Sequence, residues 1–322
     1  FTPGVGKWLA DSFAQIAPFE NIFTTVTGLP DTGKALTQSK INKLSFTGST
    51  RTAKKVAASC AEQMIPVVLE CGGKDPVIVA HDADIKLAAE YALWSAMANA
   101  GQSCIGAERV YVVESVAEEF IETIVDLAKK IKPGQSYGPA TMPSQLKVIQ
   151  SHLDDAKAKG AKFLLGGPDS VKGAFVEPVI MVDVPEDSLA MTDETFGPTL
   201  AINKVTNTDE AIKLSNASSY GLAAAVFSKR EGEKIASKLA CGMVSINSVF
   251  LFAAIASVPF GGVKDSGYGR IHGGEGLLEY TYARSVVKTR FKIPLRFTTF
   301  KRTKFSEKIL TLLIKKLYGR RK

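Results

Sequence analysis

Short apolar runs rich in Val and Ile alternate along the chain with longer segments in which apolar residues recur every three or four positions. The short runs are typical of buried strands and occupy residues 43–48, 66–70, 75–80, 108–114 and 242–247. The longer segments are typical of helices with one apolar face and occupy residues 49–63, 83–100, 115–131 and 143–160. Strands followed by helices favour an α/β fold whose sheets are largely parallel.

Residues 297–322 depart from this alternation. Their apolar residues fall at helical spacing, with Lys and Arg between them, at Phe305, Ile309, Leu312, Leu313 and Leu317. The pattern predicts a basic amphipathic helix that can lie on an anionic membrane surface. A helix docked on the rest of the protein, with its charges in water, fits the same pattern, so both interpretations stay open.

The composition is that of a globular protein with a sizeable core, since 45% of the 322 residues are hydrophobic and 22% are charged. No stretch approaches the ~18 uninterrupted apolar residues of a membrane span, and no basic-then-apolar signal segment opens the sequence. We therefore expect a cytoplasmic protein, with membrane association through residues 297–322 as an open addition.

The net charge of +8 comes from the end of the chain. Residues 297–322 hold nine Lys and Arg and one Glu, which accounts for the whole excess. The rest of the chain gives no reason to expect a nucleic-acid partner. The four cysteines show no CxxC spacing and no histidine pairs with another ligand, so we expect reduced thiols and no metal site.

Cys104 lies among small and polar residues in "AGQSCIGAERV", residues 100–110. An irregular polar turn of this kind can stabilise a thiolate, which would make the cysteine a nucleophile. A lone cysteine is more commonly inert filling in a protein interior. The local sequence leaves both interpretations open.

Glu70 ends a buried-looking strand in "VVLECGGKDP", residues 67–76, and two glycines follow soon after it. A carboxylate in that place is costly unless water or hydrogen bonds satisfy it. Burial would raise its pKa toward the range of a general base. A strand-end carboxylate in water is the alternative.

Three further segments combine glycine with other small or aromatic residues. "SFTGSTRTAKKV" reads as strand, turn and helix, where Gly48 and Ser49 can bring a phosphate to a helix N-terminus, although a plain junction fits as well. Residues 193–200, "DETFGPTL", and 258–270, "VPFGGVKDSGYGR", can be structured loops that line a cleft, or ordinary turns.

Taken together, "FTGST", "LECGGKDP", "GQSC" followed by "ERVYV", "ETFGP" and "PFGGVKDSGYGR" occur in this order and at these separations. The combination is specific, and over residues 1 to about 295 the chain resembles the aldehyde dehydrogenase superfamily. Within it, the chain most resembles the succinate-semialdehyde dehydrogenase-like members. The resemblance implies a partial Rossmann-type cofactor domain, an α/β catalytic domain and a homo-oligomer. It places the C-terminal part of the NAD(P)-binding domain in residues 1–71, the catalytic domain in 72–272, a return segment with an oligomerisation strand (284–291) in 273–296, and the basic tail in 297–322.

The resemblance also implies the chemistry. Cys104 would be the nucleophile that adds to an aldehyde to give a thiohemiacetal, hydride would pass to NAD or NADP, and a thioester would remain. Glu70 would then activate the water that hydrolyses the thioester to a carboxylic acid, and the Cys104 backbone N–H would supply half of an oxyanion hole. A thiol hydrolase or an acyl-transferring enzyme that uses Cys104 is a further reading.

The cofactor-binding positions implied by the family are Gly28, Gly33, Phe46, Gly48, Ser49, Gly72, Glu194 and Phe196. Gly48 and Ser49 would lie at the pyrophosphate, Glu194 and Phe196 at the nicotinamide ribose and ring. Gly28 and Gly33 would lie in a turn on the adenine side.

The opening segment "FTPGVGKWLADSF" matches the family just after its K-P-S/A-E stretch. The resemblance therefore predicts that an upstream part is missing, with the first half of the nucleotide-binding domain and an oxyanion-hole Asn. On this expectation the alternative function is a truncated, catalytically inactive binding or regulatory protein of the same family. Neither the aldehyde nor the choice between NAD and NADP can be read from these residues.

Overall fold

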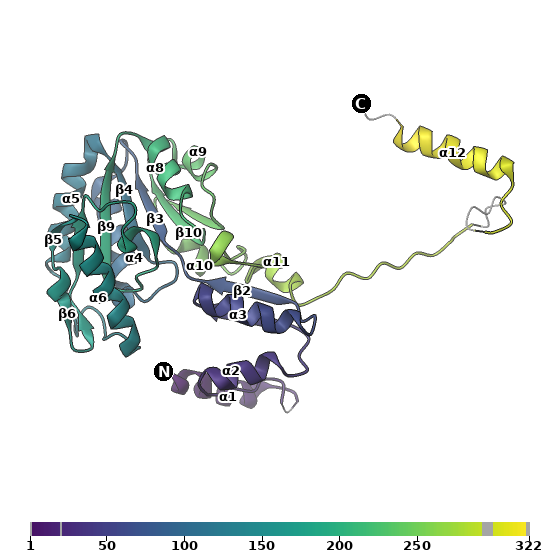
Figure 1. Ribbon diagram of the computed structural model, residues 1–322, viewed down its shortest axis with the longest axis horizontal. Coiled ribbons are helices and arrows are strands. Elements are labelled where there is room, and N and C mark those ends of the chain that lie inside the picture. The colour runs from purple at the N-terminus through teal and green to yellow at the C-terminus, as the bar shows by residue number, and fades with distance from the viewer. Residues whose placement is uncertain (1, 20, 292–298, 320–322) are drawn as a thin grey trace. The chain divides into compact units, whose positions relative to one another are not determined.

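A computed structural model describes residues 2–19, 21–291 and 299–319. The chain divides into two units, residues 1–281 and 282–322, each of which is described by itself. Among the described residues, the first unit holds a seven-stranded sheet and a three-stranded sheet with helices against them, and a separate two-stranded sheet of β6 (Val171–Lys172) and β7 (Phe175–Val176) (Figure 1). This arrangement confirms the α/β class predicted from the alternating strands and helices.

The larger sheet has seven strands in the order β11-β10-β3-β4-β9-β8-β5. All neighbours are parallel except β5 and β8. The strands are β3 (Asp75–Val79), β4 (Ala107–Val113), β5 (Lys162–Leu165), β8 (Val179–Val182), β9 (Thr199–Val205), β10 (Ala223–Phe227) and β11 (Met243–Ile246).

Helices cover this sheet on both faces. Val77 and Val79 of β3 pack into a core with helices α4 (Ile85–Met97) and α5 (Glu114–Ala128). Ile78, which points to the opposite face, packs into a second core with α6 (Pro143–Ala158), α8 (Thr208–Asn216) and α9 (Gly232–Ala236). Because both faces are buried, the central strands are continuous apolar runs rather than alternating ones.

The smaller sheet has three strands in the order β1-β2-β12. β1 (Leu44–Gly48) is parallel to β2 (Val67–Cys71), and β12 (Gly267–Tyr268) is antiparallel to β2, with Gly267 opposite Glu70. Helix α3 (Thr50–Ala61) follows β1, and the Ser49 hydroxyl caps it by accepting a hydrogen bond from the Thr52 N–H. The late segment 258–270 is thereby joined to the strand that carries Glu70.

The helices before β1 are α1 (Pro3–Ile16) and α2 (Pro30–Thr37). Gly33 lies inside α2, so the expectation that it sits in a turn is wrong. Pro30 is the first residue of this helix, a position that proline favours. The remaining short elements are η1 (Ala98–Gly101), η2 (Pro168–Ser170), β6 (Val171–Lys172), β7 (Phe175–Val176), α7 (Leu189–Thr192), α10 (Leu251–Ala254), η3 (Lys264–Ser266) and α11 (Gly273–Leu278).

The second unit confirms the predicted amphipathic helix, α12 (Lys304–Tyr318). Thr303 and Ser306 form a capping box at its start. Residues 284–291, predicted as an oligomerisation strand, have no regular secondary structure in the single chain. Across residues 2–19, 21–291 and 299–319, no helix combines the length and the apolar character that crossing a bilayer requires.

Candidate active site

Cys104 follows a tight left-handed turn at the end of α4. Asn99, Ala100 and Gly101 have φ of 54°, 58° and 69°, a conformation that costs side-chain-bearing residues about 1–2 kcal/mol each. The turn brings Gly101 against the backbone of Gly197, so that a Cβ on Gly101 would overlap the Gly197 carbonyl group. The segment that carries Cys104 is therefore fixed against the "ETFGP" segment.

The Cys104 side chain is half-buried beside a small apolar cluster that includes Leu222 and Phe260. Burial raises the pKa of the thiol to about 11, and the negative charges of Asp75, Glu194 and Glu70 add to the effect. In this state the sulfur is a thiol at neutral pH, and a base is needed to make it a nucleophile.

Glu70 is 4% exposed, so the alternative of a strand-end carboxylate in water is wrong. Its Oε1 atom has no hydrogen-bond partner among the described residues, and a Cβ on Gly261 would lie 2.8 Å from it. Burial raises the pKa of Glu70 to about 7, against the opposing effect of the nearby Arg270 guanidinium. Glu70 is thus an unpaired carboxyl group that titrates near neutrality, as a general base requires.

Glu194 lies over the Gly72–Gly73 turn. Its Oε1 accepts a hydrogen bond from the Gly73 N–H at 3.3 Å, and a Cβ on Gly72 would overlap its carboxyl group. Burial, followed by the negative charge of Glu108, raises the pKa of Glu194 to about 8. Because Gly72 has no side chain, the Glu194 carboxyl group can approach the Gly72 backbone closely.

The segment 258–270 completes the site from a distant part of the sequence. Ser266, which is fully buried, donates to the Gly72 carbonyl at 2.7 Å and accepts from the Gly221 N–H at 3.0 Å. The Thr50 hydroxyl donates to the Asp265 carbonyl at 2.7 Å. This segment therefore connects the start of α3 with the glycine turn next to Glu70.

Two buried charged residues were not among the candidates taken from the sequence. Lys74 and Glu108, 1% and 6% exposed, form an ion pair, and both lie inside the motifs "GGKDP" and "ERVYV". Charged residues that directly precede or lie within a buried strand are a signal that could have identified them, because buried charges need partners. Lys74 and Glu108 also form hydrogen bonds with the segment that carries Glu194.

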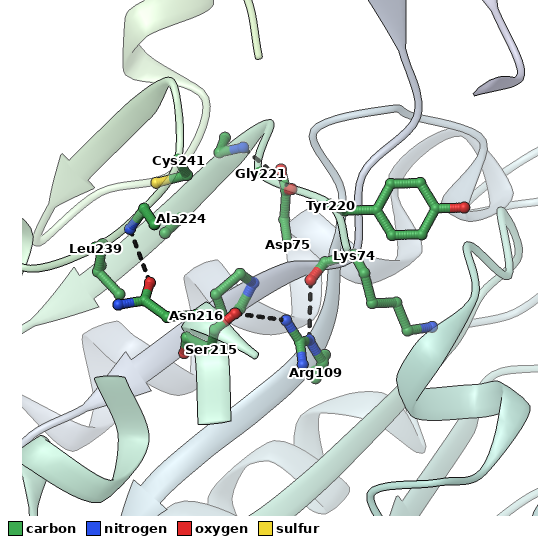
Figure 2. Close-up of a pocket in the computed structure, with 13 residues that line it drawn as sticks. Lys74, Asp75, Arg109, Ser215, Asn216, Tyr220, Gly221, Ala224, Leu239 and Cys241 are labelled. Atoms are coloured by element: carbon green, nitrogen blue, oxygen red, sulfur yellow. Dashed lines mark hydrogen bonds between the residues drawn. The ribbon is translucent and has the colours of Figure 1, made fainter. Parts of the chain in front are cut away.

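The residues next to them in sequence point elsewhere. Figure 2 shows the Lys74 and Asp75 side chains leaving the chain in different directions, with the Arg109 guanidinium at the Lys74 carbonyl, a contact of 2.9 Å. Asp75 accepts from the Ala223 N–H at 3.1 Å, and burial raises its pKa well above the usual value. Asp75 and Arg109 line a small pocket that also includes Ser215 and Cys241.

Two of the predicted cofactor positions, Gly48 and Ser49, lie at the N-terminus of α3. The first N–H groups of a helix lack acceptors within the helix, so this end suits a phosphate. The Phe46 ring lies against Gly48, where a Cβ would be 2.7 Å from its Cζ. Phe196 is half-buried beside Glu194, in a left-handed conformation with φ of 50°.

Gly28 and Gly33 are not brought to this end of α3. The hydrogen bonds between α2 and α3 lie at the C-terminal end of both helices, between Thr37 and Ser59 and from Gln63 to Thr37. The groups at the start of α3 and beside Glu194 therefore suit the pyrophosphate and nicotinamide sides of a dinucleotide.

Among the described residues, no three His, Cys, Asp or Glu side chains are arranged to hold a metal ion.

Comparison with known proteins places the chain among relatives of one kind. The model of the aldehyde dehydrogenase family matches residues 1–286. A 4,4'-diapolycopene aldehyde oxidase of Methylomonas sp is 38% identical over 296 residues, which cover 90% of this chain and 56% of that protein. A putative succinate-semialdehyde dehydrogenase [NADP(+)] 2 of Mycobacterium bovis is 38% identical over 270 residues, or 80% of this chain and 52% of that one.

Solved structures agree with the fold. An NAD-dependent aldehyde dehydrogenase from Sinorhizobium meliloti superposes with a TM-score of 0.87 at 30% identity, covering 93% of this chain and 61% of that chain. A betaine aldehyde dehydrogenase from Staphylococcus aureus in complex with NAD+ gives a TM-score of 0.77 at 33% identity, covering 85% and 57%. The chain spans about half the length of the curated relatives it matches.

Proposed function

Because this chain belongs to the aldehyde dehydrogenase family, we propose that it carries the catalytic residues of an enzyme that oxidises an aldehyde to a carboxylic acid with NAD(P)+. The observation that supports this most is the meeting of three segments at the Gly72–Gly73 turn. A Cβ on Gly72 would overlap the Glu194 carboxyl group, and a Cβ on Gly73 would lie 2.9 Å from the Cys104 carbonyl oxygen. The negative charges of Glu194 and Glu70 raise the pKa of the Cys104 thiol. The match covers 52% of a relative named as a dehydrogenase, so the activity of the whole protein is part of the proposal.

The first half of the proposed reaction begins at Cys104. The thiol proton passes to a water molecule in the site and from there to solvent, and the sulfur forms a bond to the aldehyde carbon, which becomes tetrahedral. NAD(P)+, when bound, accepts the hydride that this carbon releases. The electrons of the C–H bond leave with the hydride, and a thioester on Cys104 remains.

The second half uses Glu70. In its base form the carboxyl group takes a proton from water, and the resulting oxygen nucleophile attacks the thioester carbon. The carbon–sulfur bond breaks, and the carboxylic acid leaves while the sulfur regains a proton. A pKa of about 7 lets Glu70 serve near neutral pH, and its buried Oε1 atom, which has no hydrogen-bond partner among the described residues, is free to accept a hydrogen bond from a water molecule that enters the site.

The cofactor would be NAD or NADP, held by groups on two segments. The N-terminus of α3, with Gly48 and Ser49, would bind the pyrophosphate. Glu194 and Phe196 would face the nicotinamide ribose and ring across Gly72. Relatives that are named as NAD-dependent and NADP-dependent enzymes support either cofactor.

The substrate follows the relatives only as a class. One of them is named for succinate semialdehyde and another for an aldehyde of 4,4'-diapolycopene. A test is NAD(P)H formation from a panel that holds one carboxylated, one small neutral and one long apolar aldehyde. It compares this chain, its Cys104→Ala variant and a chain extended upstream where coding sequence allows. Activity that Cys104→Ala abolishes supports the proposal, and silence with every aldehyde and both cofactors supports an inactive binding or regulatory role.

Assembly and location complete the proposal. We propose a homo-oligomer in the cytoplasm that uses residues 284–291 between subunits, since these residues are exposed and have no partner strand in the single chain. The mass of the protein, measured by light scattering as it elutes from a size-exclusion column, tests the oligomer. A monomer at micromolar concentration contradicts the oligomer.

We also propose that α12 binds an anionic membrane surface. Within the described part of the second unit, taken by itself, nothing covers its apolar side chains, with Phe305, Leu312 and Leu317 at 68%, 67% and 71% exposure. By helical periodicity Lys304, Lys308 and Lys315 share the opposite face. With 15 residues the helix is shorter than the ~20 needed to cross a bilayer, whereas lying in the interface requires this combination of an apolar face and a basic one.

Vesicle co-sedimentation tests the membrane contact. The intact chain should sediment with phosphatidylserine-containing vesicles and not with pure phosphatidylcholine. Leu312→Asp with Leu317→Asp should abolish sedimentation, whereas Thr311→Asp, which adds the same kind of charge on the polar face, should weaken it only slightly. Binding to an acidic protein without binding to vesicles would contradict the proposal.

A further inference from the structure

Each polar group of Thr195, which lies between Glu194 and Phe196, has a hydrogen-bond partner. Its N–H donates to both carboxyl oxygens of Glu108 at 2.9 and 2.8 Å. Its carbonyl accepts from Gln145 at 2.7 Å. Its hydroxyl lies 3.1 Å from His152 Nδ1 and 3.2 Å from Lys74 Nζ. Thr195 is 1% exposed, so it anchors the segment in the interior.

Phe196 is strained beside this anchor. Its φ of 50° lies in the left-handed region, which is uncommon for a residue with a bulky side chain. Its N–H donates to Glu108 Oε1 at 2.8 Å. The same carboxyl group that binds Thr195 therefore holds Phe196 in a conformation that the isolated chain would avoid.

Glu108 also belongs to the nucleophile segment. It stands four residues after Cys104 and is the second residue of β4, all of which is buried. Lys74, from the turn that carries Gly72 and Gly73, pairs with its other oxygen. One carboxyl group thus connects all three segments of the candidate site, in addition to the backbone contact of Gly101 with Gly197.

We propose that Glu108 is a positioning residue that holds the 194–196 segment so that Glu194 and Phe196 face the cofactor. The proposal rests on the proposed function for the cofactor, but the holding of the segment can be measured without any activity. Glu108 touches neither Cys104 nor Glu70 in the contacts described, so its loss should act on the cofactor side of the site. Hydrogen bonds to a charged acceptor are stronger than neutral ones, which suits a strained segment.

The first measurement is amide hydrogen exchange of the full chain. In Glu108→Gln the exchange of peptides that contain residues 195 and 196 should rise about tenfold or more, while peptides from β9 stay unchanged. Because Glu108→Gln leaves the buried Lys74 ammonium unpaired, Lys74→Met with Glu108→Gln is the second variant. Glu186→Gln is the control, since that carboxyl group accepts from Tyr111 and Asn203 away from the segment.

The second measurement is the kinetic one. Both Glu108 variants should raise KM for NAD(P)+ about tenfold or more and change KM for the aldehyde less than twofold. Unchanged exchange at residues 195 and 196, or a rise shared by the whole sheet, would overturn the proposal. If the unmodified chain shows no dehydrogenase activity, the exchange result still decides whether Glu108 holds the segment, and only the proposed function fails.

Discussion

Gly101 lies against the backbone of Gly197 so closely that a Cβ on Gly101 would overlap the Gly197 carbonyl group. This contact sets the nucleophile turn against the segment of Glu194 and Phe196. Two chain segments that are far apart in sequence can thus pack backbone against backbone because Gly101 has no side chain. The relation between Cys104 and the cofactor side of the site depends on it.

Gly101→Ala tests that contact. The new methyl group must push the two segments apart, so we expect a loss of activity of about tenfold or more with a loss of stability. The matched control is Gly160→Ala, which also adds a Cβ at positive φ, 93°, but has no atom within 4 Å of it. The control should cost only the backbone strain of about 1–2 kcal/mol and leave activity unchanged. Equal activity losses in both variants would contradict the account.

Glu70 predicts the pH dependence of turnover. A carboxyl group with a pKa of about 7 is mostly protonated below that pH and is a base only above it. The rate of thioester hydrolysis should therefore rise as pH increases through about 7 and then level off. Glu70→Gln should lower the rate by about a hundredfold or more and remove this rise. A wild-type profile that stays flat from pH 5 to about 9 would show that another group acts as the base.

Cys104 predicts slow alkylation. With a pKa of about 11, the thiol holds a few hundredfold less thiolate at pH 8 than a cysteine of pKa about 8.5 holds. Iodoacetamide should therefore label Cys104 slowly, as followed by mass spectrometry. Glu194→Gln removes one of the negative charges that raise this pKa and should speed labelling several-fold. Glu186→Gln, with its charge away from the site, should have no effect.

Ser266 predicts a local loss of stability. Removing its hydroxyl leaves the Gly72 carbonyl and the Gly221 N–H without their buried partner. Ser266→Ala should cost about 1–3 kcal/mol in the free energy of unfolding, measured by denaturant titration. It should also lower activity, because the glycine turn is no longer held. Ser151→Ala, whose hydroxyl bonds only to the Val148 carbonyl on an exposed helix face, should change stability by less than about 0.5 kcal/mol.

The sequence predicted β3, β4 and β11 of the larger sheet as short apolar runs, which a parallel sheet buried on both faces requires. It missed β5, β8 and β9, although β8 is also a continuous apolar run. It also predicted Cys104, Glu70 and Glu194 as site residues through motif resemblance. β10 escaped prediction because its residues Ala223–Ala225 are small and favour helix as much as strand. Packing between β3 and β11 decides its conformation, and no local pattern records that packing.

Glu108 and Lys74 escaped prediction for another reason. Each stands in a recognised motif, but its partner lies in a different segment, so only the fold brings the two together. The holding of Thr195 and Phe196 by one carboxyl group is also a tertiary relation. In contrast, the position of Glu70 near the end of a strand was visible in the sequence, whereas its burial was left open there and is decided by the structure.

The measurement that tests the central claim most directly is a single-turnover experiment on Glu70→Gln in the longest folded form of the protein. With an accepted aldehyde and NAD(P)+, the variant should release about one NAD(P)H per Cys104 in a burst and then stall, because the thioester is no longer hydrolysed. Mass spectrometry should find the acyl group on the peptide that contains Cys104, and Cys104→Ala should give no burst. Steady turnover of Glu70→Gln at the wild-type rate, or turnover by Cys104→Ala, would contradict the assignment of both residues.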